Sequence, residues 1–140
     1  MSKSNAFETA LLALIFNGTA IADIAENDTT SPATTLTVSL HTGDPGEAGT
    51  MTTSEATYTS YARVTVNRNS GGWTVSGNSV SPTADIAFPQ ATGGTNTITH
   101  FGIGTGVSNN LMYSGSVTPS ISVSDGVQPV LSSASTITED

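Results

Sequence analysis

The chain of 140 residues contains no cysteine, so neither a disulfide bond nor a thiolate metal site contributes to its fold. Positive charge is also scarce: three lysine or arginine residues stand against eleven acidic ones, giving a formal net charge of −8. Proteins that bind nucleic acid or acidic membrane surfaces usually cluster basic residues that neutralise phosphates. Neither nucleic acid nor a membrane is therefore expected as a partner.

Long hydrophobic runs are missing as well, and none approaches the roughly 20 apolar residues that a membrane-spanning helix needs. The apolar run 10–16 and the residues after it loosely imitate a secretory signal peptide. Glu8, however, stands where a basic region belongs, and Asn17-Gly18 interrupts the apolar run. We therefore expect the N-terminal segment to belong to the folded protein rather than to a secretion signal.

What the chain does contain is a pattern typical of β-structure. Disorder usually comes with high charge and few β-branched residues, whereas only 10% of these residues are charged and valine, isoleucine and threonine recur at strand spacing. Leu36, Val38 and Leu40 alternate with polar residues, as in a half-buried strand. In all, about seven to nine short strands separated by turn sequences predict a mainly β fold, a β-sandwich or jelly-roll-like domain.

A short amphipathic helix is expected before the strands, over residues 5–16. Asn5 and Glu8 have the spacing of a capping box, and Asn17-Gly18 suits the end of a helix. Its apolar face either packs on the domain's own sheet or docks on a neighbouring subunit. The residues assigned to that face are Phe7, Leu11, Leu14 and Ile15.

The domain organisation follows from these patterns. A polar connector containing Pro32 separates the helical period from the strand period. We therefore predict an N-terminal helix and arm with a linker over residues 1–30, and a β-sandwich domain over residues 31–140.

The stretch 40–68 joins two predicted strands through an acidic, glycine-rich loop. Asp44, Glu47 and Glu55 are hard oxygen donors of the kind that suits calcium, but their spacing matches no EF-hand and T-G-D-P-G is first of all a turn sequence. Arg63 follows the loop and is one of only three cations. It either pairs with a loop carboxylate and ties the loop to the strand, which we favour, or contacts an acidic partner.

Neither a catalytic residue, a cofactor site nor a metal site is expected, so the chain is not interpreted as an enzyme. His41 and His100 are candidate bases, but no G-x-S-x-G elbow is present to supply a nucleophile. Gly102, Gly104 and Gly106 are not followed by a helix-forming sequence, as the dinucleotide fingerprint requires, and instead predict a weak or bulged strand end. One tryptophan, three tyrosines and four phenylalanines offer little for the aromatic lining of a glycosidase cleft.

The sequence LHTGDPGEAGT, residues 40–50, with a Y-A-R segment at 61–63, resembles small virion proteins of tailed bacteriophages. Relatives of this kind are described as tail-fibre proteins or resemble capsid decoration (cement) proteins. The likeness covers nearly the whole chain. Its further segments are SNAFE at 4–8, GGWTV at 71–75, THF at 99–101, YSG at 113–115 and TED at 138–140.

The resemblance implies a structural protein of the virion, assembled in the host bacterial cytoplasm. A trimeric fibre usually shows repeats or coiled-coil segments, and this chain shows neither. We therefore expect a capsid decoration or cement protein that binds the outer shell and stabilises the head by bridging capsid subunits. Its partners are then the major capsid protein and copies of itself, with trimers implied by the resemblance.

The residues expected at the protein interface are Phe7, Leu11, Leu14, Ile15, Asp44, Glu47 and Arg63. Two alternative functions remain at this stage. The first is a tail, neck or fibre structural component. The second is a carbohydrate-binding module, which would expose aromatic side chains together on one sheet face. The candidates for that platform are Tyr58, Tyr61, Trp73 and Tyr113.

Overall fold

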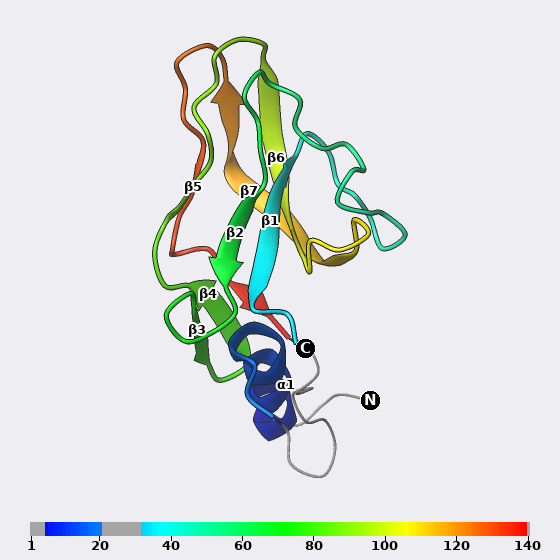
Figure 1. Cartoon of the computed structure of the whole chain (residues 1–140), viewed down its shortest axis with the longest axis vertical. Helices are drawn as coiled ribbons and strands as arrows, with labels where there is room; N and C mark the ends of the chain where they lie inside the picture. Colours follow the sequence, from blue (N-terminus) through cyan, green and yellow to red (C-terminus); the bar gives the residue numbers. More distant parts are fainter. Residues whose placement is uncertain (1–4, 21–31, 140) are drawn as a thin grey trace. The chain divides into compact units, whose positions relative to one another are not determined.

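The computed structural model describes residues 5–20 and 32–139, which form one helix and nine strands (Figure 1). The predicted mainly β fold with a short N-terminal helix is confirmed. No helix in the described ranges is long and apolar enough to cross a membrane. The elements in chain order are α1 (Asn5–Asn17), β1 (Thr35–His41), β2 (Val64–Asn67), β3 (Trp73–Ser76), β4 (Ser79–Pro82), β5 (Ile86–Ala87), β6 (Asn96–Gly104), β7 (Leu111–Val123), β8 (Val130–Leu131) and β9 (Ile137–Thr138).

The chain forms two compact units, each built from segments distant in sequence. The first unit contains the described residues of Met1–Thr35 together with Asn67–Ile86 and Leu131–Asp140, and the second contains Leu36–Val66 and Ala87–Val130. The strands are ordered β2-β1-β6-β7, β3-β4-β9 and β5-β8 in three sheets. The predicted division into residues 1–30 and 31–140 stays a prediction, and most of its linker lies outside the described residues.

In the first unit, the buried stripe of helix α1 has residues one turn apart, Glu8, Leu12 and Phe16. Leu12 and Phe16 are fully buried, and the ring of Phe16 meets the buried Trp73 of β3 edge-on at 4.9 Å between centroids. Leu11, Leu14 and Ile15 are only half-buried. The stripe of the helix that packs on the sheet therefore differs from the predicted apolar face. The physical reason is that residues 10–16 are apolar throughout, and a continuous apolar run does not reveal which stripe is buried.

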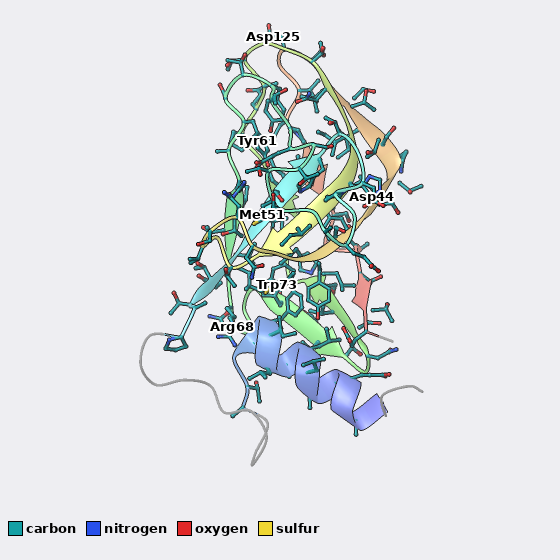
Figure 2. All side chains as sticks on the ribbon, turned by 90° about the vertical axis from the view of Figure 1, so that its right-hand side faces the viewer. Asp44, Met51, Tyr61, Arg68, Trp73 and Asp125 are labelled. Atoms are coloured by element: carbon teal, nitrogen blue, oxygen red, sulfur yellow. The ribbon has the colours of Figure 1, made fainter. Side chains whose placement is uncertain are left out.

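Arg68, which follows β2, caps the C-terminal end of this helix. Its Nε donates to the carbonyl of Ile15 at 2.6 Å and its Nη2 to the carbonyl of Leu14, and Figure 2 shows Arg68 beside α1. The last four carbonyls of a helix have no partner within the helix, so these bonds satisfy groups that would otherwise be left open. Gly18 then takes the left-handed conformation, at φ 66°, in which the chain leaves the helix.

In the second unit, β1 and β6 pair antiparallel, with Val38 opposite Ile103 and Leu40 opposite Phe101. These four buried side chains share one face of the sheet, because strand residues alternate between faces. The opposite face of the same two strands is polar and glycine-rich. Its paired residues are Thr37 with Gly104, Ser39 with Gly102 and His41 with His100.

Candidate functional site

The segment between β1 and β2, residues 42–63, is called the long loop below, and it folds back onto β1. The amide of Thr42 donates to the carbonyl of Ser54, and the amide of Ala56 donates to the carbonyl of Leu40, each at 2.8 Å. The loop therefore belongs to the packed body of the second unit. Its buried residues are Pro45, Met51, Ala56 and Tyr58 (Figure 2 labels Met51).

An ion pair inside the second unit ties the end of the long loop to its middle. Arg63 Nε donates to Glu55 Oε1 at 2.6 Å and Arg63 Nη2 to Glu55 Oε2 at 2.8 Å, a two-pronged arrangement that fixes direction as well as distance. Arg63 Nη1 also donates to Asn109 Oδ1 at 2.9 Å. Hydrogen bonding to Glu55 is the main reason that the pKa of Arg63 is raised. The predicted pairing of Arg63 with a loop carboxylate is confirmed.

Tyr61 joins this ion pair to the sheet. Its hydroxyl donates to Glu55 Oε1 at 3.0 Å and accepts from the backbone amide of Leu40 at 3.0 Å. Burial is the main cause that raises the pKa of Tyr61, so the hydroxyl stays protonated and available as a donor. The Tyr61 ring also stacks with Phe88 and meets Tyr58 edge-on. One side chain thus anchors the loop through both its polar tip and its ring.

A buried histidine fastens the loop to the polar face of the sheet. Nδ1 of His41 bonds to the carbonyl of Thr53 at 2.8 Å, and Nε2 lies 2.8 Å from Oγ of Ser39. Because a carbonyl only accepts, Nδ1 carries the proton and Nε2 accepts from the Ser39 hydroxyl. Burial is the main cause that lowers the pKa of His41, which fits this neutral form. Both side chains are fully buried, so the serine–histidine contact is closed to a substrate.

Two glycines of β6 allow close packing against this strand, Gly102 against β1 and Gly104 against the long loop. A Cβ on Gly102 would stand 2.7 Å from Nε2 of His41, and one on Gly104 would stand 2.7 Å from Sδ of Met51 and clash with the backbone oxygen of Asn110. The pairing of β6 with β7 also shifts register beside Gly104, which confirms the predicted bulge. The glycine spacing therefore serves close packing, a role that sequence reasoning did not assign.

An open groove of ≈ 510 Å³ lies between the tip of the long loop and strand β7. Asp44 and Glu47 are exposed there, and the tip is held in shape because the amide of Gly46 donates to Oδ1 of Asp44 at 2.9 Å. Figure 2 shows Asp44 on the side of the unit where β7 runs. The residues that line the groove are Asp44, Gly46, Glu47, His100 and the six consecutive residues Leu111 to Ser116.

The predicted interface residues are distributed between the two units. Asp44 and Glu47 come together in the groove, whereas Arg63 of the same unit is held by Glu55. Leu11, Leu14 and Ile15 lie half-buried on α1 in the first unit, and the side chain of Phe7 is outside the described residues. Their role as contacts stays a prediction. Within the part of the chain that the structure describes, no three histidine, aspartate or glutamate side chains are placed to hold a metal ion.

The aromatic platform expected of a carbohydrate-binding module does not form from the four candidate residues. Tyr58 and Trp73 are buried, and Tyr61 and Tyr113 are half-buried. Trp73 also belongs to the first unit and the three tyrosines to the second. These side chains therefore do not present stacking faces together.

Several residues of the loop network escaped sequence reasoning. Ser39 and His41 are two apart on a predicted strand, so their shared face was a readable signal of contact. The contribution of Tyr61 had no such signal, because it depends on the fold-back of the loop onto β1. The position of β7 at the edge of its sheet depends on the order of the strands. The alternation of apolar and polar residues along a strand does not specify that order.

Residues 2–138 of the chain match the family described as Podophage GP4 fiber I protein gp80. A search of curated proteins gives no match. The family match spans the described segments of both compact units, and it includes the long loop and the groove.

Proposed function

The chain belongs to the podophage GP4 fiber I protein gp80 family, and from this premise we propose that it is a fibre component of a phage tail. Membership of the family makes it a structural protein of the phage virion, assembled in the host cytoplasm. The family description favours the tail, neck or fibre alternative over the capsid decoration role that compactness suggested. The observation that carries the proposal is the match over residues 2–138.

The geometry of the second unit supports a structural role. A subunit that occupies equivalent positions in a particle must present the same surface in every copy. The long loop meets this requirement because Glu55, Arg63, Tyr61 and His41 fix it from within the unit. Such a preorganised surface binds without the entropic cost of ordering a mobile loop.

We propose that this role is structural rather than enzymatic. The pair of Ser39 and His41 resembles a nucleophile and its base in distance, but full burial denies a substrate access to it. The neutral histidine instead uses both ring nitrogens to join the loop to the sheet. For a fibre component, the expected partners of the protein are other tail proteins rather than the major capsid protein. Self-association as a trimer stays a prediction.

A phage that carries a stop codon early in this gene tests the proposal. If the protein is a fibre component, the mutant particles should have filled heads of normal heat resistance and should adsorb poorly to the host. A decoration protein predicts the reverse, because heads that lack it should release DNA at a lower temperature. Particles with fragile heads and normal adsorption would contradict the fibre assignment.

A further inference from the structure

We propose that residues 50–54 of the long loop, called the strap below, open from the sheet when His41 gains a proton. The inference concerns the response of the long loop to acid, which the proposed function does not address. It depends on three features of the second unit. The ring of His41 lies beneath the strap, the surroundings of the ring suit its neutral form, and individual hydrogen bonds hold the strap in place.

The imidazole of His41 lies between the strap and strand β6. His41 stands opposite His100 on the polar face of the β1–β6 pair, and its side chain is fully buried. On one side of the ring, Nδ1 donates to the carbonyl of Thr53 in the strap at 2.8 Å. On the other side, Nε2 stands close to β6, because a Cβ on Gly102 would lie 2.7 Å from it. The ring therefore reaches water only if the strap or the strand moves away.

The hydrogen bonds of the ring suit its neutral form. Nε2 accepts from Oγ of Ser39 at 2.8 Å. A proton on Nε2 turns this nitrogen into a donor, so the Ser39 hydroxyl must rotate and direct its own proton to the carbonyl of Gly102. That carbonyl lies 3.5 Å from Oγ, which is the outer limit of a hydrogen bond. Protonation therefore weakens the bonding of Ser39 and leaves a buried charge beside neutral partners, which is costly.

The charged and titratable groups around His41 do not compensate for this burial. Glu55 favours a charge on the ring, whereas Arg63 and His100 oppose it. The carboxylate of Glu55 is also held by Arg63 in the bidentate ion pair. Burial outweighs both the hydrogen bond to Thr53 and these charges, and it lowers the pKa of His41. A proton on His41 is therefore accepted more readily when the ring is exposed to water.

The strap is the element that can move with the least loss of structure. Strand β6 is hydrogen-bonded on both sides, to β1 and to β7. The bonds that join the strap to its surroundings include those from Thr42 N to the Ser54 carbonyl at 2.8 Å and from Met51 N to the Asn109 carbonyl at 3.0 Å. Ser54 also has a left-handed backbone, at φ 53°, which a residue other than glycine adopts at a cost. Segments held in this way open at a lower free energy than the sheet beneath them.

Opening of the strap hydrates the charged ring and leaves the sheet intact. The Glu55–Arg63 ion pair and the bond from Ala56 N to the Leu40 carbonyl lie beyond the strap, so they keep the end of the long loop in place. Because the open form binds the proton more tightly, closure is fully favoured above a pH of about 6.5 and weakens as the pH falls below that value. Opening also uncovers Met51, which is fully buried in the closed form.

Oxidation of Met51 by hydrogen peroxide measures this opening in the full-length protein. Oxygen transfer to the thioether requires an accessible sulfur, and mass spectrometry identifies the modified residue. Between about pH 7.5 and about pH 5.0, the rate at Met51 should rise about five- to thirtyfold, since an exposed histidine takes up a proton near pH 6.5. Met112, which is half-buried outside the strap, is the internal control and should change little.

Two histidine variants separate the trigger from other effects of acid. His41→Gln should give the same rate of Met51 oxidation at both pH values, and His100→Gln should retain the rise. A rate that does not change with pH in the unmodified protein would overturn the inference, as would an equal rise in His41→Gln. Loss of the β-sheet circular dichroism signal at the lower pH would also overturn it, because the whole unit would then have unfolded.

Nuclear magnetic resonance of the unmodified protein supplies a test that does not depend on the folding of His41→Gln. The ring of His41 and the backbone amides of the strap should titrate with a common midpoint below the usual pKa of histidine, and the amides of β6 should stay unperturbed. Different midpoints for the ring and the strap would overturn the inference.

Discussion

Arg63 forms a bidentate ion pair with Glu55, in which Nε donates to Oε1 at 2.6 Å and Nη2 donates to Oε2 at 2.8 Å. Glu55 lies opposite His41 in an isolated β-bridge, so the pair joins the end of the long loop to the strand from which the loop departs. Side chains of both residues are about one-fifth exposed, at 22% and 17%. The pair is thus more shielded from solvent than a typical surface ion pair, and it determines the path of the loop.

Arg63→Lys keeps the charge but loses the two-pronged geometry and the bond to Asn109. We expect it to lower the free energy of unfolding by about 1–2 kcal/mol, because a lysine ammonium replaces the fork with a single point contact. Urea unfolding followed by tyrosine fluorescence measures this. Asp125→Asn should stay within about 0.5 kcal/mol of the unmodified protein. A Lys variant as stable as the unmodified protein would show that the bidentate contact is energetically unimportant.

Gly104→Ala places a methyl group against Sδ of Met51 and the backbone of Asn110. We expect a loss of about 1–3 kcal/mol in the free energy of unfolding, since overpacking forces the loop away from the sheet. Gly43→Ala is the matched control in the same loop, because its Cβ would meet no heavy atom closer than 3.6 Å. Equal stability of the two variants would contradict the close packing of the long loop against β6 at Gly104.

Arg68→Met removes the donors that satisfy the carbonyls of Leu14 and Ile15. Leaving these groups without a protein partner should cost about 1–2 kcal/mol and increase the opening of α1. Hydrogen exchange resolves this, since the amides of the last turns of α1 should exchange faster. Arg63→Met perturbs the other unit and should leave α1 exchange unchanged; comparable acceleration in both variants would contradict the assignment.

Acidification should destabilise the protein through His41, whose pKa burial lowers. At a pH above about 6.5 the histidine is neutral in both the folded and the unfolded state. Below that pH, His41 binds a proton in the unfolded state but stays neutral in the folded state. The free energy of unfolding therefore falls by up to about 1.4 kcal/mol per pH unit until the pH reaches the pKa of His41 in the folded state.

Urea unfolding at about pH 7.5 and 5.5 tests this linkage. The unmodified protein should lose more stability on acidification than His41→Gln, in which position 41 does not titrate. His100→Gln serves as the control and should retain the loss. Identical pH dependence in the unmodified protein and His41→Gln would exclude a contribution from His41.

Much of the secondary structure could be predicted from the sequence because local patterns determine it. The alternation of Leu36, Val38 and Leu40 predicts a strand, and these residues lie in β1. The helix 5–16 is found as Asn5–Asn17, since Asn17-Gly18 provides a local stop. The pairing of Arg63 with a loop carboxylate was also predictable, because hardly any other cation is available to the acidic loop.

Other features depend on contacts between distant segments, and local patterns do not encode them. The uniform apolar run 10–16 hides that Leu12 and Phe16 form the packed stripe, which is determined by the position of Trp73. The groove requires the loop tip and β7 to meet, although about seventy residues separate Asp44 from Leu111 through Ser116 in the chain. The glycines of β6 carry no periodic signal that distinguishes close packing from a weak strand end.

The position and copy number of the protein on the phage particle test the central claim most directly. Immunogold labelling of intact particles, combined with quantitative mass spectrometry relative to the major capsid protein, measures both. A fibre component predicts gold at the tail and about a dozen copies per particle, or a few tens if each fibre is an oligomer. Gold distributed over the head with hundreds of copies would contradict the fibre assignment and support capsid decoration.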